Sequence, residues 1–283
     1  MNYLKTTLLL GILTGVLVVF GQLIGGSHGA MMFLIIAAIM NFIAYWFSDK
    51  IVLMTYRAKP VGPEDAPVLY NVVKRLTERA QMPMPKVYIV ENPTPNAFAT
   101  GRNPKHASVA ATTGILQILS EQELEGVMAH ELSHVQNRDI LISSVAATIA
   151  GAITLIANVV QWGAMFGGGS RDENDRGNIF VMLAMAILAP IAAMIIQMAI
   201  SRSREYAADY AGAKLCQKPL ALASALGRLE NGIRRIPMQG GSPSTAHLFI
   251  VNPFRGGAML NLFSTHPPME ERIRRLEQLS REM

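Results

Sequence analysis

The sequence predicts a mainly α-helical membrane protein with four transmembrane helices and a cytoplasmic α+β domain that contains a small antiparallel sheet. Three observations lead to this fold class. Long uncharged apolar blocks alternate with polar segments, basic residues gather at one side of the blocks, and short β-type runs lie between the second and third blocks. The composition agrees, since 51% of the 283 residues are hydrophobic and only 16% are charged.

Four uncharged blocks are near the length of about 20 residues that a helix needs to cross the hydrocarbon core. They cover residues 6–24, 30–47, 140–166 and 179–201. The first block could instead be a cleaved signal peptide, because Lys5 precedes it, but the second block follows almost at once and favours a helical hairpin. The last two blocks could be buried helices of a soluble core, although their length and lack of charge favour spans.

Basic residues near the span ends predict the orientation. They are Lys5, Lys50, Arg57, Lys59, Arg138, Arg202 and Arg204. The loops on the other side are uncharged or slightly acidic. We therefore expect a multi-pass membrane protein with both termini in the cytoplasm. Transmembrane hairpins at 1–48 and 140–201 would alternate with the two parts of the cytoplasmic domain, 49–139 and 202–283.

Composition also bounds the partners. The single cysteine, Cys216, agrees with a reducing compartment and excludes an internal disulfide. The net charge of +5 fits a protein that faces the cytoplasm and contacts a lipid bilayer. No block of basic residues with interleaved aromatics suggests nucleic acid. The oligomeric state leaves no signal in the sequence.

The first cytoplasmic segment reads as helix, strands, helix. An apolar stripe through Leu69, Val72 and Leu76 predicts a helix after residue 63. Three runs of strand composition follow, at 86–90, 96–100 and 107–112, and the turn-rich residues 101–104 separate the last two. A second helix is expected from Ser120, where Glu123 completes a capping box, to about Asp139.

The second helix carries the pattern that matters most for function, His130-Glu131-Leu132-Ser133-His134. Helix positions i and i+4 lie on one face about one turn apart, so both imidazoles can reach one metal ion while Glu131 lies beside it as a base. An uncharged block starts at Ile140, so the site is expected close to the cytoplasmic surface of the membrane.

Catalytic zinc usually takes three protein ligands and a water, so a third ligand is needed. No carboxylate or histidine occurs from 140 to 166, and the acids of the 167–178 loop would lie across the bilayer. Glu205 is the first candidate after the fourth span. Asp209, on the same helical face, is either the ligand itself or an outer acceptor that orients a liganding histidine. The alternative without function is a solvated pair of acids neutralised by Arg202 and Arg204.

The remaining chain is expected to be helical over 202–215, 220–229 and 268–282, with a loop over 236–263.

The whole chain resembles the HtpX-like integral-membrane zinc metallopeptidases, which are related to the CAAX prenyl endopeptidases. The resemblance lies in the order of two spans, His130-Glu131-Leu132-Ser133-His134, two further spans and Arg204-Glu205-Tyr206-Ala207-Ala208-Asp209. Residues 96–101 and 264–268 also resemble family signatures.

The resemblance implies a gluzincin-type metallopeptidase domain with one Zn²⁺ per chain, held by His130, His134 and Glu205. It implies Glu131 as the catalytic base and a stabilising role for His266 and Arg272 at the oxyanion. It also implies an edge strand for substrate backbone, with Asn96, Ala97, Phe98 and Ala99 as its residues. The resemblance further implies, as the expected activity, cleavage of membrane or misfolded proteins at the cytoplasmic face of a bacterial inner membrane, in quality control and the stress response.

Two other classes of function compete with a peptidase. A transporter would usually place ionisable groups inside its spans, and the four blocks contain none. A membrane-anchored chaperone or scaffold that retains a structural zinc is the alternative. Structural zinc sites are usually closed by four Cys or His ligands, which the single cysteine makes difficult.

Overall fold

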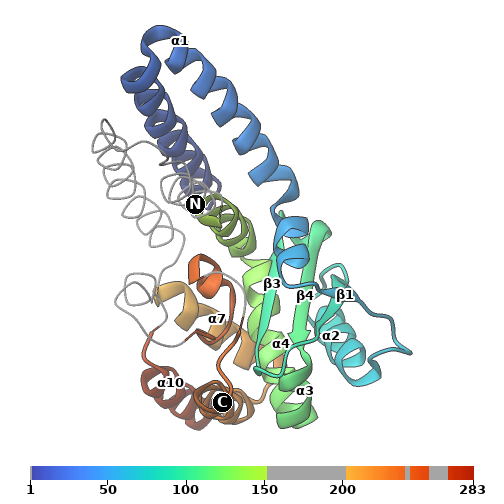
Figure 1. The fold of residues 1–283 in the computed structure, drawn as a ribbon. Helices are drawn as coiled ribbons and strands as arrows, with labels where there is room; N and C mark the ends of the chain where they lie inside the picture. Colours follow the sequence, from blue (N-terminus) through green and yellow to red (C-terminus); the bar gives the residue numbers. More distant parts are fainter. Residues whose placement is uncertain (1, 152–201, 240–242, 255–266) are drawn as a thin grey trace.

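The computed structural model describes residues 2–151, 202–239, 243–254 and 267–283 (Figure 1). Most of the third expected span, the whole of the fourth and His266 lie outside these residues. The described part is mostly helical, with one small sheet.

α1 (Asn2–Thr55) is a helical hairpin, because its helical geometry is broken at Gly25 and Gly26. Gly26 has a φ of 58°, a left-handed conformation that glycine adopts without steric cost. Near the bend the arms are very close, and a Cβ added to Gly21 would meet the Gly29 carbonyl oxygen at 2.5 Å. Figure 1 shows the two arms side by side, reaching away from the rest of the protein. The hairpin expected at the N-terminus is thus present as two packed helical arms.

One helix in the described residues, Gly25–Thr55, is long and apolar enough to cross a membrane. It has 31 residues and a mean hydropathy of 2.1 in its most apolar stretch. Thr6–Val19 and Asp139–Gly151 are shorter apolar helices. At 1.5 Å per residue the long arm measures about 46 Å, more than the roughly 30 Å of a hydrocarbon core. Its C-terminal end can therefore extend beyond a membrane and pack on the domain beneath it.

The sheet contains β1 (Lys59–Pro60), β2 (Lys86–Val90), β3 (Ala97–Gly101) and β4 (Ala107–Thr112), in the order β1-β2-β4-β3. The three expected strands are present, but the expected antiparallel sheet is wrong. The sheet is mixed, because β2 and β4 run parallel while β3 and β4 run antiparallel. After β2 the chain first forms β3, at the outer edge of the sheet. It then turns back at residues 102–106 and forms β4 between β2 and β3, parallel to β2.

Six further α-helices belong with the sheet to the described domain. They are α2 (Pro67–Arg79), α3 (Thr113–Ile118), α4 (Glu121–Gln136), α7 (Arg202–Cys216), α8 (Pro219–Arg235) and α10 (Met269–Glu282). The helices expected after residue 201 are confirmed as α7, α8 and α10. α4 is the central one, because it contacts α2, β3, α7 and α8. The predicted capping box at its N-terminus is also present, between Ser120 and Glu123.

An aromatic cluster joins the long arm of α1 to the domain. The rings of Tyr56, Phe98 and Phe249 lie with their centroids 5.0 to 5.8 Å apart. Phe98 belongs to β3, and Phe249 follows the short 3-10 helix η2 (Pro243–Leu248). Because offset and edge-on aromatic pairs stabilise packing, the cluster fixes the end of the hairpin against the edge of the sheet.

Gly212 allows α7 to approach α4. A Cβ at Gly212 would meet the backbone nitrogen of His130 at 2.8 Å, a contact that only movement of a helix can relieve. We predict that Gly212→Ala lowers the free energy of unfolding by about 1–3 kcal/mol through overpacking. Thermal or denaturant unfolding in detergent measures the change.

Gly227→Ala is the matched control, since a Cβ there would meet only the side-chain tip of Ile273, at 3.9 Å. It should leave stability unchanged or raise it by up to about 1 kcal/mol through helix propensity. Equal stability of the two variants would contradict the close approach of α4 and α7.

Candidate metal centre

α4 supplies three residues of the site. His130 and His134 lie one turn apart, and their Nε2 atoms are 3.2 Å from each other. His130 and Glu131 are buried, with exposed fractions of 1% and 3%. The close approach of two ring nitrogens in the protein interior is the arrangement that the i, i+4 spacing predicts for a shared metal ion.

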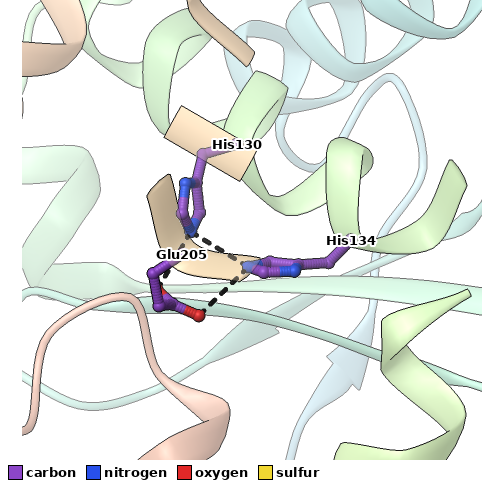
Figure 2. Close-up of side chains that lie close together, drawn as sticks. All are labelled: His130, His134 and Glu205. Carbon is purple, nitrogen blue, oxygen red and sulfur yellow. Dashed lines mark hydrogen bonds and ion pairs between the residues drawn. The ribbon is translucent and has the colours of Figure 1, made fainter. Parts of the chain in front are cut away.

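Glu205, in the first turn of α7, completes the group. Its Oε1 lies 3.5 Å from Nε2 of His134, and its Oε2 lies 3.8 Å from Nε2 of His130. Figure 2 shows the three side chains pointing toward one another from the two helices. One donor atom from each residue lies within 4.8 Å of the others. The fold therefore brings together the two histidines and Glu205, the first candidate for the third ligand.

The donor set fits a tetrahedral metal ion. Bonds of 2.0–2.1 Å to nitrogen and oxygen put two ligand atoms of a tetrahedron about 3.3–3.4 Å apart. The distances of 3.2, 3.5 and 3.8 Å between the donor atoms are close to this value. Two imidazoles and one carboxylate are a ligand set of catalytic zinc sites, which keep the fourth position for water or substrate.

Asp209 lies on the far side of His130 from Glu205, one turn after it on α7. Its Oδ1 is 2.9 Å from Nδ1 of His130, the ring nitrogen that faces away from the other donors. Nε and Nη2 of Arg272 donate to the same carboxylate at 2.8 and 2.7 Å. The position of Asp209 is that of an outer acceptor that orients the first histidine.

His134 has an acidic neighbour too, Asp139, which the sequence analysis did not single out. Oδ2 of Asp139 lies 3.3 Å from Nδ1 of His134, and Oδ1 lies 3.6 Å from Nη1 of Arg204. Its position five residues after His134 is the signal in the sequence that could have identified it. The contact between Asp139 and His134, however, depends on how the chain turns after α4.

The site shifts the pKa values of its groups. Burial raises the pKa of Glu131 to about 7, and a hydrogen bond from the backbone N–H of Ala99 only partly offsets this effect. Burial also lowers the pKa of His130. For Asp209, burial works to raise the pKa, but the charge and hydrogen bonds of Arg272 outweigh it and lower the pKa to about 2. A carboxyl group whose pKa lies near neutrality, as in Glu131, suits a base that must take up and return a proton.

A small cavity opens beside these side chains. Its lining residues are Ala99, His130, Glu131, His134, Asp139, Ile140, Ser143, Glu205, His247, Leu248, Phe249 and Ile250. His247 also lines the cavity, although it was not among the expected site residues. Its Nε2 lies 3.0 Å from the Ser143 carbonyl oxygen. No local pattern marks this histidine, because only the fold of residues 243–254 brings it to the cavity.

The expected substrate strand is β3, which is the edge strand of the sheet. Ala99 lines the cavity, whereas Asn96, Ala97 and Phe98 are buried and hold residues 249–251 of the same chain. The Ile250 N–H donates to the Ala97 carbonyl oxygen at 3.2 Å, and Nδ2 of Asn96 donates to the Val251 carbonyl oxygen at 2.6 Å. Part of the outer edge of β3 is thus paired within the chain.

Of the two residues expected at the oxyanion, His266 lies outside the described residues. Arg272, on α10, is fully buried and does not line the cavity. Besides Asp209, its guanidinium donates to the Ile250 carbonyl oxygen at 2.9 Å. Arg272 therefore lies behind the candidate ligands, where it fixes Asp209.

Known proteins are similar to this chain over most of its length. The model of peptidase family M48 matches residues 63–280. The chain is 59% identical to a protein described as "Protease HtpX homolog" from Syntrophotalea carbinolica, over 99% of both chains. It is 54% identical to a protein of the same description from Thermococcus kodakarensis, over 99% of this chain and 97% of that one.

A solved structure, that of S. mikatae Ste24p, aligns with 98% of this chain and 63% of its own chain, at 19% identity and a TM-score of 0.49. The family match covers both segments that carry the metal centre, α4 and α7. The chain belongs to peptidase family M48 and is a membrane-associated metalloprotease.

Proposed function

We propose that this protein is a zinc-dependent endopeptidase in which His130, His134 and Glu205 bind one zinc ion and Glu131 is the catalytic base. The observation that carries the proposal is the approach of Glu205 to both imidazoles, with donor distances that suit tetrahedral coordination. A scaffold with a closed structural site needs a fourth protein ligand, and the relatives of this chain are described as proteases.

The chemistry follows from the groups around the cavity. When bound, zinc polarises the scissile carbonyl and lowers the pKa of a water molecule. The Glu131 carboxylate takes the proton of the attacking water and passes it to the leaving amine. The Ala99 N–H holds this carboxylate in place, and burial keeps its pKa near neutrality. Asp209 and Arg272 keep His130 oriented.

The substrate backbone is proposed to pair with β3 at Ala99, the strand residue that borders the cavity. Asn96, Ala97 and Phe98 support this strand through their contacts with residues 249–251. We keep His266 as the proposed oxyanion donor. For Arg272, the buried contacts support positioning of Asp209 more than direct contact with the oxyanion. Main-chain pairing depends little on sequence and favours broad specificity.

The proposed topology has four spans, with hairpins at 1–48 and 140–201 and the two parts of the peptidase domain, 49–139 and 202–283, in the cytoplasm. The basic residues at the span ends support it. The metal centre would then lie near the inner surface of a bacterial plasma membrane, with membrane proteins and misfolded chains as substrates. The apolar Asp139–Gly151 helix starts directly after α4, which carries both histidines, and this supports a site close to the bilayer.

The role of Glu131 is tested by Glu131→Gln in purified protein loaded with zinc. We expect casein hydrolysis and self-cleavage to fall by about 10²–10⁴-fold, because the amide cannot take up the proton of water. Metal analysis should still find one zinc per chain. Glu121→Gln, an exposed change on the same helix, is the control and should keep full activity. Undiminished hydrolysis by Glu131→Gln would exclude this residue as the base.

The third ligand is tested by Glu205→Ala beside Asp209→Ala. Loss of Glu205 should abolish stoichiometric zinc, whereas loss of Asp209 should weaken zinc binding by about 10–100-fold, as for an outer partner of a liganding histidine. Elemental analysis after dialysis at several zinc concentrations separates the two outcomes. Stoichiometric zinc in Glu205→Ala would transfer the ligand role to Asp209 or another group.

Topology is tested with reporters fused after Met283. A reporter that is active only in the cytoplasm should be active, because the proposed number of spans is even and the basic residues favour a cytoplasmic C-terminus. A reporter that works only after export is the paired control and should be silent. The reverse result would overturn the orientation.

A further inference from the structure

Both proposed liganding histidines use their two ring nitrogens in the same way. Each Nε2 faces Glu205, at 3.8 Å for His130 and 3.5 Å for His134. Each Nδ1 faces an aspartate, Asp209 at 2.9 Å and Asp139 at 3.3 Å. A neutral imidazole that donates from Nδ1 must present its Nε2 lone pair on the other side. Asp139 therefore bears the same relation to the second histidine as Asp209 bears to the first.

Each aspartate is in turn held by an arginine. Nη2 of Arg272 lies 2.7 Å from Oδ1 of Asp209, and Nη1 of Arg204 lies 3.6 Å from Oδ1 of Asp139. The two oxygens of Asp139 are engaged separately, since Oδ2 faces His134 and Oδ1 faces Arg204. Asp139 has an exposed fraction of only 6%. A carboxylate that merely began a helix at the surface would be expected to face solvent and not an imidazole.

The backbone after α4 creates this contact. In a continuous helix, a residue five positions after His134 would point about 140° away from it around the axis. Here α4 ends at Gln136, and Arg138 has a φ of 59°, a left-handed conformation. The next helix, Asp139–Gly151, starts at once. The turn thus brings the Asp139 carboxylate back to the ring of His134.

We propose that Asp139 is a positioning residue for His134, fixing the ring so that Nε2 faces the metal, and that Arg204 holds the Asp139 carboxylate. The proposal deepens the zinc-peptidase function and rests on it. It also links the metal centre to the apolar Asp139–Gly151 helix, whose Leu141, Ile142 and Val145 pack with Leu9 and Leu13 of α1. A shift of this helix would move the residue that orients a ligand.

The test is the zinc affinity of the full-length protein in detergent, measured by competition with a chelator. Asp139→Asn keeps the shape of the side chain but removes its charge, and we expect zinc binding to weaken by about 10–100-fold. The Co²⁺-substituted variant should show an altered visible absorption spectrum, because the orientation of one ligand changes. Glu91→Gln removes an exposed carboxylate from its pair with Lys59 and should change neither readout.

Zinc affinity of Asp139→Asn within about threefold of the unmodified protein, with an unchanged Co²⁺ spectrum, would overturn the proposal. Thermal unfolding of the metal-free variant checks that it folds. If Asp139→Asn does not fold, the zinc affinity of Arg204→Gln tests the proposal instead, because this variant leaves Asp139 in place. Weaker zinc binding, recovered in Arg204→Lys, supports the proposal, and unchanged binding overturns it. These readouts do not use peptidase activity, so failure of Glu131→Gln to lose hydrolysis would count against the proposed function alone.

Discussion

The close packing of α4 on α7 is the contact on which the candidate metal centre depends. Glu205 follows His134 by 71 positions in the numbering, yet its short side chain reaches both imidazoles. It can do so because Gly212 has no Cβ to hold the two helix backbones apart at His130. The same approach places Asp209 on the outer nitrogen of His130. One helix pair thus sets both a proposed ligand and the group that orients another.

Charge in the interior has to be balanced, and the domain does this with paired groups. A fully buried arginine without partners would be costly, by several kcal/mol or more. Arg272 offsets this cost with two hydrogen bonds to Asp209 and one to the Ile250 carbonyl oxygen. These bonds attach α10, near the end of the chain, to the metal helices. Buried ionisable groups at such density are typical of a functional site and not of a core that only stabilises a fold.

The edge of the sheet serves the site from the other side. In β3, the backbone N–H of Ala99 donates a hydrogen bond to Glu131, and Ala99 also borders the cavity. At the other end of the strand, the Ala97 carbonyl oxygen accepts a hydrogen bond from the Ile250 N–H. Phe98 and Phe249 bring this edge against Tyr56, at the end of the long arm of α1. The proposed base, the strand proposed for substrate and the apolar N-terminal hairpin are consequently parts of one packed structure.

The sequence by itself determined what depends on short spacings: the apolar hairpin with its bend near Gly25, the capping box at Ser120, and a helix that presents His130, Glu131 and His134 together. Family membership also followed from motifs. Glu205 could be predicted as the third ligand because the expected spans leave few acidic residues on the same side of the membrane as the histidine pair. Only the tertiary structure decided the parallel pairing of β2 with β4, the contacts of Asp139 and His247, and the burial of Arg272 behind Asp209. Periodicity reports which face of an element is apolar, but contacts between distant segments depend on how these elements pack together.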